Sequence, residues 1–197
     1  MKKHNFVLIF FLYFLSIINV NSTEPDVFVQ STVNRASKIL SDNISKEKKM
    51  EELQIIAKET VDIRGIGFYS LGKHRKNMTN QEKKEYLDIF EKYFLKSFSS
   101  RLAEYTDPRI RVESQKKLND KYTMVSSILL ATEDKPELKI DWRVVTKDPN
   151  NPLIIDVVIE GVSLAKVQKE EFNSIIQSND GEMNALFKNL KDFVKKK

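Results

Sequence analysis

The sequence predicts an α+β fold, in which N-terminal helices lead into a four-stranded antiparallel sheet and C-terminal helices follow it. Three observations predict this order. Apolar residues recur every three or four positions between residues 29 and 105, they alternate or form short runs between residues 109 and 159, and helical spacing returns after Gly161. The strand-like segments are separated by short turns, which favour antiparallel pairing.

The first 22 residues are expected to be a signal peptide that lies outside this fold. Met1, Lys2 and Lys3 form a short basic start, and residues 6–18 are an apolar run of thirteen residues interrupted only by Ser16. Such a run is too short to span a bilayer comfortably and matches the core of a signal peptide. An uncleaved N-terminal anchor is the alternative. We therefore expect export and a single domain over residues 23–197.

Three helices are predicted before the longest one. Pro25 suits a first turn, and the apolar face of this first helix carries Val29, Val33, Ala36 and Leu40. Ser45 can cap a second helix, whose apolar face carries Met50, Leu53, Ala57 and Val61. A short third helix begins near Asp62 and ends at Gly72. Its glycines do not form a phosphate loop, because no strand precedes them and no Lys-Ser/Thr pair follows.

The longest predicted helix begins at Thr79, because the segment Thr79-Asn80-Gln81-Glu82 fits a capping box. It is expected to reach about Tyr105, before Pro108 ends it. Its apolar face is rich in aromatic residues and comprises Leu87, Phe90, Phe94, Phe98 and Leu102.

Four strands are predicted, over residues 109–114, 122–132, 138–144 and 153–159. One face of the third strand carries Leu138, Ile140, Trp142 and Val144. In the fourth strand, Ile155, Val157 and Ile159 point to one side, while Asp156 and Glu160 point to the other. A strand with a wholly aliphatic face needs an apolar cover, and that cover is either protein or a ligand.

Two further helices are predicted after the sheet. Gly161 ends the last strand, and the Ser163 hydroxyl is placed to cap the helix that follows. This helix carries Val167, Phe172, Ile175 and Ile176 and ends near Gly181. The final helix carries Met183, Leu186, Phe187, Leu190 and Phe193.

Composition argues against several classes of function. The chain has no cysteine, which rules out thiol catalysis, and His74 is the only histidine once residues 1–22 are removed. A zinc site would therefore need carboxylates almost alone. We expect no enzyme, metal or cofactor, and we expect His74 to be a surface or packing residue. Loss of Lys2 and Lys3 lowers the net charge from +5 to +3, and no basic stripe with interleaved aromatic residues indicates nucleic-acid binding.

Several segments resemble one known family. Residues 156–164 are DVVIEGVSL, Phe172 precedes the triplet Ser174-Ile175-Ile176, and Phe68, Leu71-Gly72, His74 and Thr79 stand upstream. With the segment LAEY at residues 102–105, these motifs resemble the MlaC family of periplasmic phospholipid-shuttle proteins, also called toluene-tolerance or ABC-transporter auxiliary proteins. The resemblance covers about residues 44–194. Arg75 and Leu153 depart from the pattern, since the family often has Trp at both positions.

The resemblance implies a periplasmic carrier that maintains outer-membrane lipid asymmetry. Such a carrier moves phospholipid between an inner-membrane ABC transporter and an outer-membrane lipoprotein–porin complex. It holds the acyl chains in an apolar cavity between the sheet and the helices, with the phospholipid as cargo and not as a cofactor. The residues that we expect to line this cavity are Phe90, Phe94, Phe98, Ile140, Trp142, Val144, Ile155, Val157, Ile159, Val162 and Leu164.

Two other functions fit the same pattern of elements. One is an exported protein-binding module or inhibitor with a solid core and no lipid. The other is an enzyme on a similar scaffold, which the scarcity of acid–base groups disfavours. A buried carboxylate lining the cavity would favour the enzyme.

Overall fold

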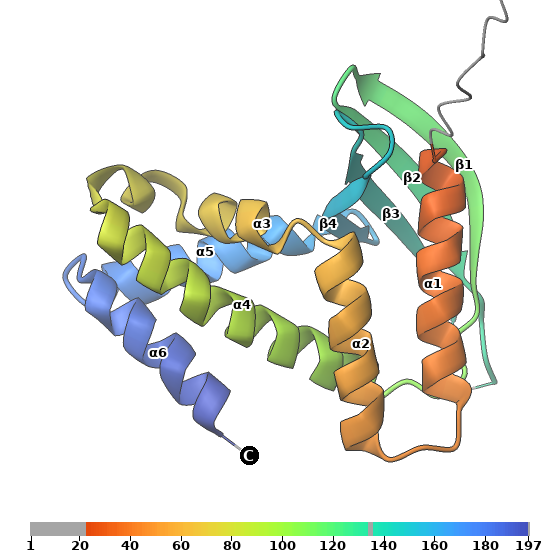
Figure 1. Cartoon of the computed structure of the whole chain (residues 1–197), viewed down its shortest axis with the longest axis horizontal. Coiled ribbons are helices and arrows are strands. Elements are labelled where there is room, and N and C mark those ends of the chain that lie inside the picture. Colours follow the sequence, from red (N-terminus) through yellow and green to blue (C-terminus); the bar gives the residue numbers. More distant parts are fainter. Residues whose placement is uncertain (1–22, 134–135, 197) are drawn as a thin grey trace, which may run out of the picture.

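The computed structural model describes residues 23–133 and 136–196, so the expected signal peptide lies outside the described part of the chain. Helices precede and follow a sheet, as predicted (Figure 1). The helices before the sheet are α1 (Pro25–Ser41), α2 (Lys46–Thr60), α3 (Ile63–Leu71), the 3₁₀ helix η1 (Gly72–Asn77) and α4 (Asn80–Leu102). The sheet consists of β1 (Ile110–Asn119), β2 (Tyr122–Leu129), β3 (Leu138–Val145), β4 (Leu153–Ile159) and β5 (Val162–Ser163). The helices α5 (Leu164–Gln177) and α6 (Met183–Lys195) follow it.

Local chemistry at the helix starts agrees with the predicted caps. The Ser45 hydroxyl accepts a hydrogen bond from the backbone N–H of Lys48 at 3.2 Å. Thr79 and Glu82 form the reciprocal capping box at the start of α4. The Ser163 hydroxyl caps α5 by accepting from the N–H of Lys166 at 3.1 Å. In the described part of the chain, no helix combines the length and the apolar character that crossing a bilayer needs.

The sheet is antiparallel and has the strand order β1-β2-β3-β4-β5. The prediction of four strands was wrong, because the described residues form five. β5 pairs with the end of β4 through the turn at Glu160 and Gly161, whose φ angles are 48° and 81°. Positive φ at both positions is the geometry of a tight hairpin turn. A strand of two residues has no periodicity, so the sequence pattern could not reveal it.

The first strand is also longer than predicted. β1 continues past Ser114 to Asn119 with a bulge between Val112 and Ser114. Its second half is exposed and, apart from Leu118, polar, and it pairs with β2 alone because β1 is an edge of the sheet. An edge strand that is open to solvent needs no apolar alternation, which explains why the pattern ended early.

One apolar cluster lies where α1 covers one face of the sheet. Val29 and Val33 of α1 meet Val125 of β2 and Val144 of β3, and all four are buried. Phe28, Ile110, Val112 and Trp142 pack around them. We call this the sheet cluster. Figure 1 shows α1 running along β1 and β2 on this side of the sheet.

A second apolar cluster lies among the helices away from the sheet. This helical cluster is drawn mainly from α3, α4, α5 and α6. Its centre is aromatic, since the Phe172 ring lies edge-on to Phe90 with 6.1 Å between centroids and 5.8 Å from the Tyr93 centroid. Burial raises the pKa of the Tyr93 phenol. The buried residues of the helical cluster are Ile66, Leu71, Met78, Tyr86, Ile89, Phe90, Tyr93, Phe172, Ile176, Leu186, Phe187 and Leu190.

Strand β4 connects the sheet to the helices that form the helical cluster. Its residue Ile154 forms a parallel bridge with Val61 at the end of α2, and its carbonyl accepts from the N–H of Asp62 at 3.0 Å. Helices α3 and α5 both contact β4. The long helix α4 contacts α2, α3 and α6, and α2 stands between it and α1 (Figure 1).

Candidate functional site

The aliphatic face of β4 is the candidate site. Ile155, Val157 and Ile159 are each only partly buried, and within the described residues none of them belongs to the sheet cluster or the helical cluster. Val157 stands directly opposite Trp142, and Ile159 stands opposite Ile140. Partners that stand opposite each other share a face of the sheet. The β4 face therefore continues the apolar face covered by α1 but lies outside the cluster that α1 forms.

A bulge gives Ile155 a special place on this strand. Arg143 pairs with Asp156, and the next residue, Val144, pairs with Ile154. Ile155 is the extra residue between these two pairs, so simple alternation does not determine its direction. The pairing register therefore places Val157 and Ile159 on a common face, as predicted, but does not fix the direction of Ile155.

The aromatic stripe of α4 begins inside the helical cluster and continues beyond it. Phe90 is 1% exposed and belongs to that cluster. Phe94 is partly buried against it, and its ring stacks on Phe98 with 5.8 Å between centroids and 8° between planes. Phe98 is partly buried and belongs to neither cluster. The stripe thus ends in an aromatic side chain that the core of the described residues leaves incompletely packed.

The remaining predicted residues divide into interior and surface. Ile140 and Val144 are buried on β3, and Trp142 packs against the sheet cluster. The Trp142 indole donates a hydrogen bond to the Ser127 hydroxyl at 2.8 Å. Val162 and Leu164, at the joint between β5 and α5, are 53% and 45% exposed. These two side chains lie on the surface beside the end of β4, not in an enclosed space.

Asp156 is a buried charged residue whose burial sequence reasoning missed. Its carboxylate accepts from the backbone N–H of Ala165 at 3.0 Å and from the Ser163 hydroxyl at 2.7 Å. The Arg143 guanidinium lies 3.4 Å away, from the neighbouring strand. Asp156 points away from the aliphatic face, as predicted, but β5 and α5 bury it. The sequence feature that could have indicated its burial is the position of an acidic residue within an otherwise aliphatic strand, shortly before a helix begins.

This arrangement makes Asp156 a structural cap. Both of its oxygens accept hydrogen bonds from the first turn of α5 and from β5, so the carboxylate fixes where α5 begins relative to the sheet. The described residues contain no group of three or more His, Asp or Glu side chains arranged to hold a metal ion. His74 has the neutral partner Asn173, with 3.0 Å between the imidazole Nε2 and the amide oxygen.

A family model described as MlaC protein matches residues 30–192. The chain belongs to the MlaC family. Among solved structures, it resembles a phospholipid-binding protein from Ralstonia solanacearum that was solved in complex with a phospholipid. The TM-score is 0.71 at 17% sequence identity, and the match covers 87% of this chain and 97% of that chain. This likeness shows the fold. No curated protein matches the chain.

The MlaC-like motif at residues 156–164 coincides with the joint just described. Asp156 supplies the buried cap, Glu160 and Gly161 make the turn with positive φ, and Ser163 caps α5. Each of these positions has a structural reason, and none requires catalysis. The motif therefore marks how the last strand and α5 are fastened together.

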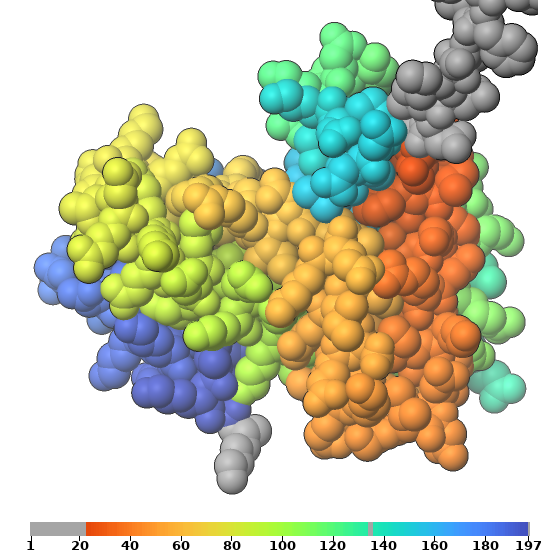
Figure 2. All heavy atoms as spheres, viewed as in Figure 1, coloured from red at the N-terminus to blue at the C-terminus, as the bar shows by residue number. Residues whose placement is uncertain are grey.

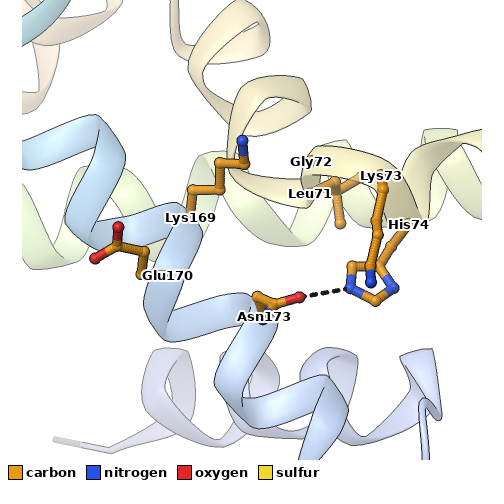
Figure 3. A pocket seen from close by; sticks show the side chains of 7 residues that line it. All are labelled: Leu71, Gly72, Lys73, His74, Lys169, Glu170 and Asn173. Carbon is orange, nitrogen blue, oxygen red and sulfur yellow. Dashed lines mark hydrogen bonds between the residues drawn. The ribbon is translucent and has the colours of Figure 1, made fainter.

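Two surface hollows lie at η1, remote from the β4 face. One, of about 390 Å³, is lined by Phe68, Arg75, Lys76 and Lys83. The other, of about 320 Å³, is lined by Leu71, Gly72, Lys73, His74, Lys169, Glu170 and Asn173 (Figure 3). Neither lies between the sheet and the helices, so the apolar cavity predicted there stays a prediction.

Proposed function

We propose that this protein is an exported phospholipid carrier whose acyl-chain site includes the β4 face and the end of the α4 stripe. One observation supports the proposal above all. Val157, Ile159 and Phe98 are apolar, they are only partly buried, and they lie outside both apolar clusters. A carrier needs apolar surface that its own fold leaves unfilled, because a filled core has nothing to offer an acyl chain.

The chain of contacts between the elements supports this location. α4 packs on α2, α2 packs on α1, and α1 packs on β1 and β2. On the other side, α3 contacts both α4 and β4, and Val61 bridges to Ile154. We infer that the acyl chains lie inside this ring of contacts, with the β4 face and Phe98 on its inner side. Val162 and Leu164, which are exposed, would then lie at its mouth.

The energetic need for such a site follows from the cargo. Each acyl methylene exposed to water costs about 0.8 kcal/mol, so a two-chain lipid crosses an aqueous space only inside an apolar shelter. Family membership and the phospholipid bound by the solved neighbour support a phospholipid as the ligand. We further propose that the protein works in the periplasm, between an inner-membrane ABC transporter and an outer-membrane lipoprotein–porin complex. No acid–base group is required for this task.

The first test is recovery of the cargo. The protein is purified without detergent as it accumulates in the cell, and native mass spectrometry and lipid extraction identify what it carries. We expect about one phospholipid per chain. Protein that is repeatedly lipid-free, and that takes no lipid from vesicles, would contradict the proposal and favour the protein-binding module with a solid core.

A matched pair of variants tests the location of the site. Val157 and Val158 are neighbours on β4 and are both partly buried, but they point to opposite faces of the sheet. In Val157→Gln, the amide would have to lie against acyl chains without a partner, at a cost of about 2 kcal/mol, or roughly 30-fold in lipid affinity. Val158→Gln, opposite Asp141, is the control and should load normally.

The comparison depends on both variants being folded, which circular dichroism and a melting curve establish. Equal loading of two folded variants would place the acyl chains elsewhere, even if the purified protein carries lipid. A loss confined to Val158→Gln would place them on the other face of the sheet.

A further inference from the structure

Basic side chains line the hollows beside η1. This helix lies at the end of the molecule opposite the sheet (Figures 1 and 2). Arg75 and Lys76 of η1 and Lys83 of α4 line one hollow together with Phe68 of α3. The Arg64 guanidinium lies over the same Phe68 ring, 5.5 Å from its centroid. One partly buried aromatic ring is thus surrounded by four cationic side chains that come from three elements.

The second hollow beside η1 also has a lysine that contacts an aromatic ring. Lys73 and Lys169 line it, and the Lys169 ammonium lies 5.1 Å from the centroid of the Tyr69 ring. The stem of Lys169 crosses Gly72 so closely that a Cβ added there would lie 2.9 Å from Lys169 Cε. Tyr69 is itself 45% exposed. We call these six cations and two rings the basic face: Arg64, Lys73, Arg75, Lys76, Lys83 and Lys169, with Phe68 and Tyr69.

These cations are not neutralised by the protein. In the described part of the chain, ten ion pairs form, and none of them includes a cation of the basic face. Two nearby acids, Glu82 and Glu170, have other partners, and Glu170 also lines the second hollow. Glu82 accepts hydrogen bonds from Thr79 in the capping box, and Glu170 lies 3.7 Å from Lys166. An external anion is therefore the partner that this face lacks.

We propose that the basic face docks the protein on the surface of an anionic membrane. Protein surfaces that lie at the level of lipid head groups combine lysine and arginine with aromatic residues, as this face does. The cations attract the anionic head groups, and the aromatic rings can lie in the interface between head groups and water. Docking through η1 leaves the sheet, at the other end of the molecule, pointing away from the membrane.

This inference does not rest on the carrier function. It concerns a surface charge, so a protein that holds no lipid in its interior would dock equally well. The two proposals fail separately, because docking is measured as protein that stays with vesicles, whereas loading is measured as lipid that leaves with the protein.

The test is flotation with vesicles of phosphatidylcholine, with or without phosphatidylglycerol, at low and high salt. The protein is purified as the cell accumulates it, and intact mass spectrometry records its N-terminus. We expect more binding to the phosphatidylglycerol vesicles at low salt and loss of that difference at high salt. Each lysine or arginine near an anionic membrane surface raises the affinity for the vesicles about fivefold. Arg75→Glu with Lys76→Glu should therefore weaken binding by about 25-fold or more.

The control has the same charge change at the opposite end. Lys116 and Lys121, on β1 and in the turn after it, are exposed and form none of the ion pairs found in the described chain. Lys116→Glu with Lys121→Glu should bind anionic vesicles within a few-fold of the unchanged protein. Equal losses in the two double variants would overturn the proposal, since net charge alone would then explain binding. The proposal would also be overturned if the unchanged protein bound equally to vesicles with and without phosphatidylglycerol.

Discussion

Replacing Asp156 by alanine should destabilise the protein strongly, although the residue lies in a strand and touches no proposed ligand. The substitution removes the acceptor of the Ala165 N–H, at 3.0 Å, and of the Ser163 hydroxyl, at 2.7 Å. It also removes the partner of Arg143. These three groups come from α5, β5 and β3, so a single carboxylate connects three elements around β4.

The magnitude follows from what each group loses. Ala165 is 9% exposed, and leaving its N–H without an acceptor costs about 1–3 kcal/mol. The Ser163 hydroxyl loses a charged acceptor, worth about 1.5 kcal/mol at the lower end of such bonds, because it remains partly exposed. The Arg143 side chain is 40% exposed and can be hydrated, so its contribution is below about 1 kcal/mol. Together these losses amount to about 2.5–5.5 kcal/mol.

Equilibrium unfolding in urea, followed by circular dichroism, measures this loss as a lower midpoint at an unchanged slope. Asp156→Asn, which keeps one oxygen for the Ala165 N–H, should lose about half as much. Asp141→Ala is the matched control on β3. Its carboxylate accepts from the Ser126 hydroxyl at 2.6 Å and lies 3.5 Å from the Lys139 ammonium, but within the described residues it accepts from no backbone N–H. We expect it to lose about 1 kcal/mol. An Asp156→Ala loss no larger than that of the control would refute the capping role.

Three further substitutions test a packing contact, a helix-end contact and a backbone conformation, each by urea unfolding. Gly67→Ala should lose about 1–2 kcal/mol net, because the added Cβ would meet the buried Phe90 ring at 2.8 Å, which outweighs the gain in helix propensity; a gain in stability would show that the ring yields. Lys96→Met should lose about 2 kcal/mol, because its ammonium donates to the carbonyls of Phe193, Val194 and Lys196 at the end of α6; an unchanged midpoint would remove that role. Gly161→Val should lose about 1–2 kcal/mol from its φ of 81° alone, since an added Cβ would meet no atom within 4 Å. Gly161→Asn, which tolerates this φ, is the control and should lose less.

The sequence by itself determined the order of the elements and most of their ends. The capping box at Thr79, the caps at Ser45 and Ser163 and the end of α3 at Gly72 all appear where the pattern predicted them. These features depend on hydrogen bonds between residues three or four positions apart. Such bonds can be inferred from a short window of sequence. The resemblance to the MlaC family was also visible in the sequence, and the family model confirms the family.

The tertiary structure decided how the apolar faces are shared. Helical spacing showed that Phe90 and Phe98 lie on one face of α4, but only packing shows that the first is buried among helices and the second is not. The bulge at Ile155 likewise depends on pairing with β3. An amphipathic pattern states that a face seeks apolar cover, and it does not state which partner covers it or how completely.

The same division applies to charge. No basic stripe is evident along the sequence, because the cations of the basic face come from α3, η1, α4 and α5, over residues 64–169. The sequence placed Asp156 on the side of its strand opposite the aliphatic face, and it is buried there because β5 and α5 return over it. Sequence spacing determines neighbours within one helix or strand. The neighbours that make a site, a buried cap or a charged surface come from distant segments, and only the folded chain brings them together.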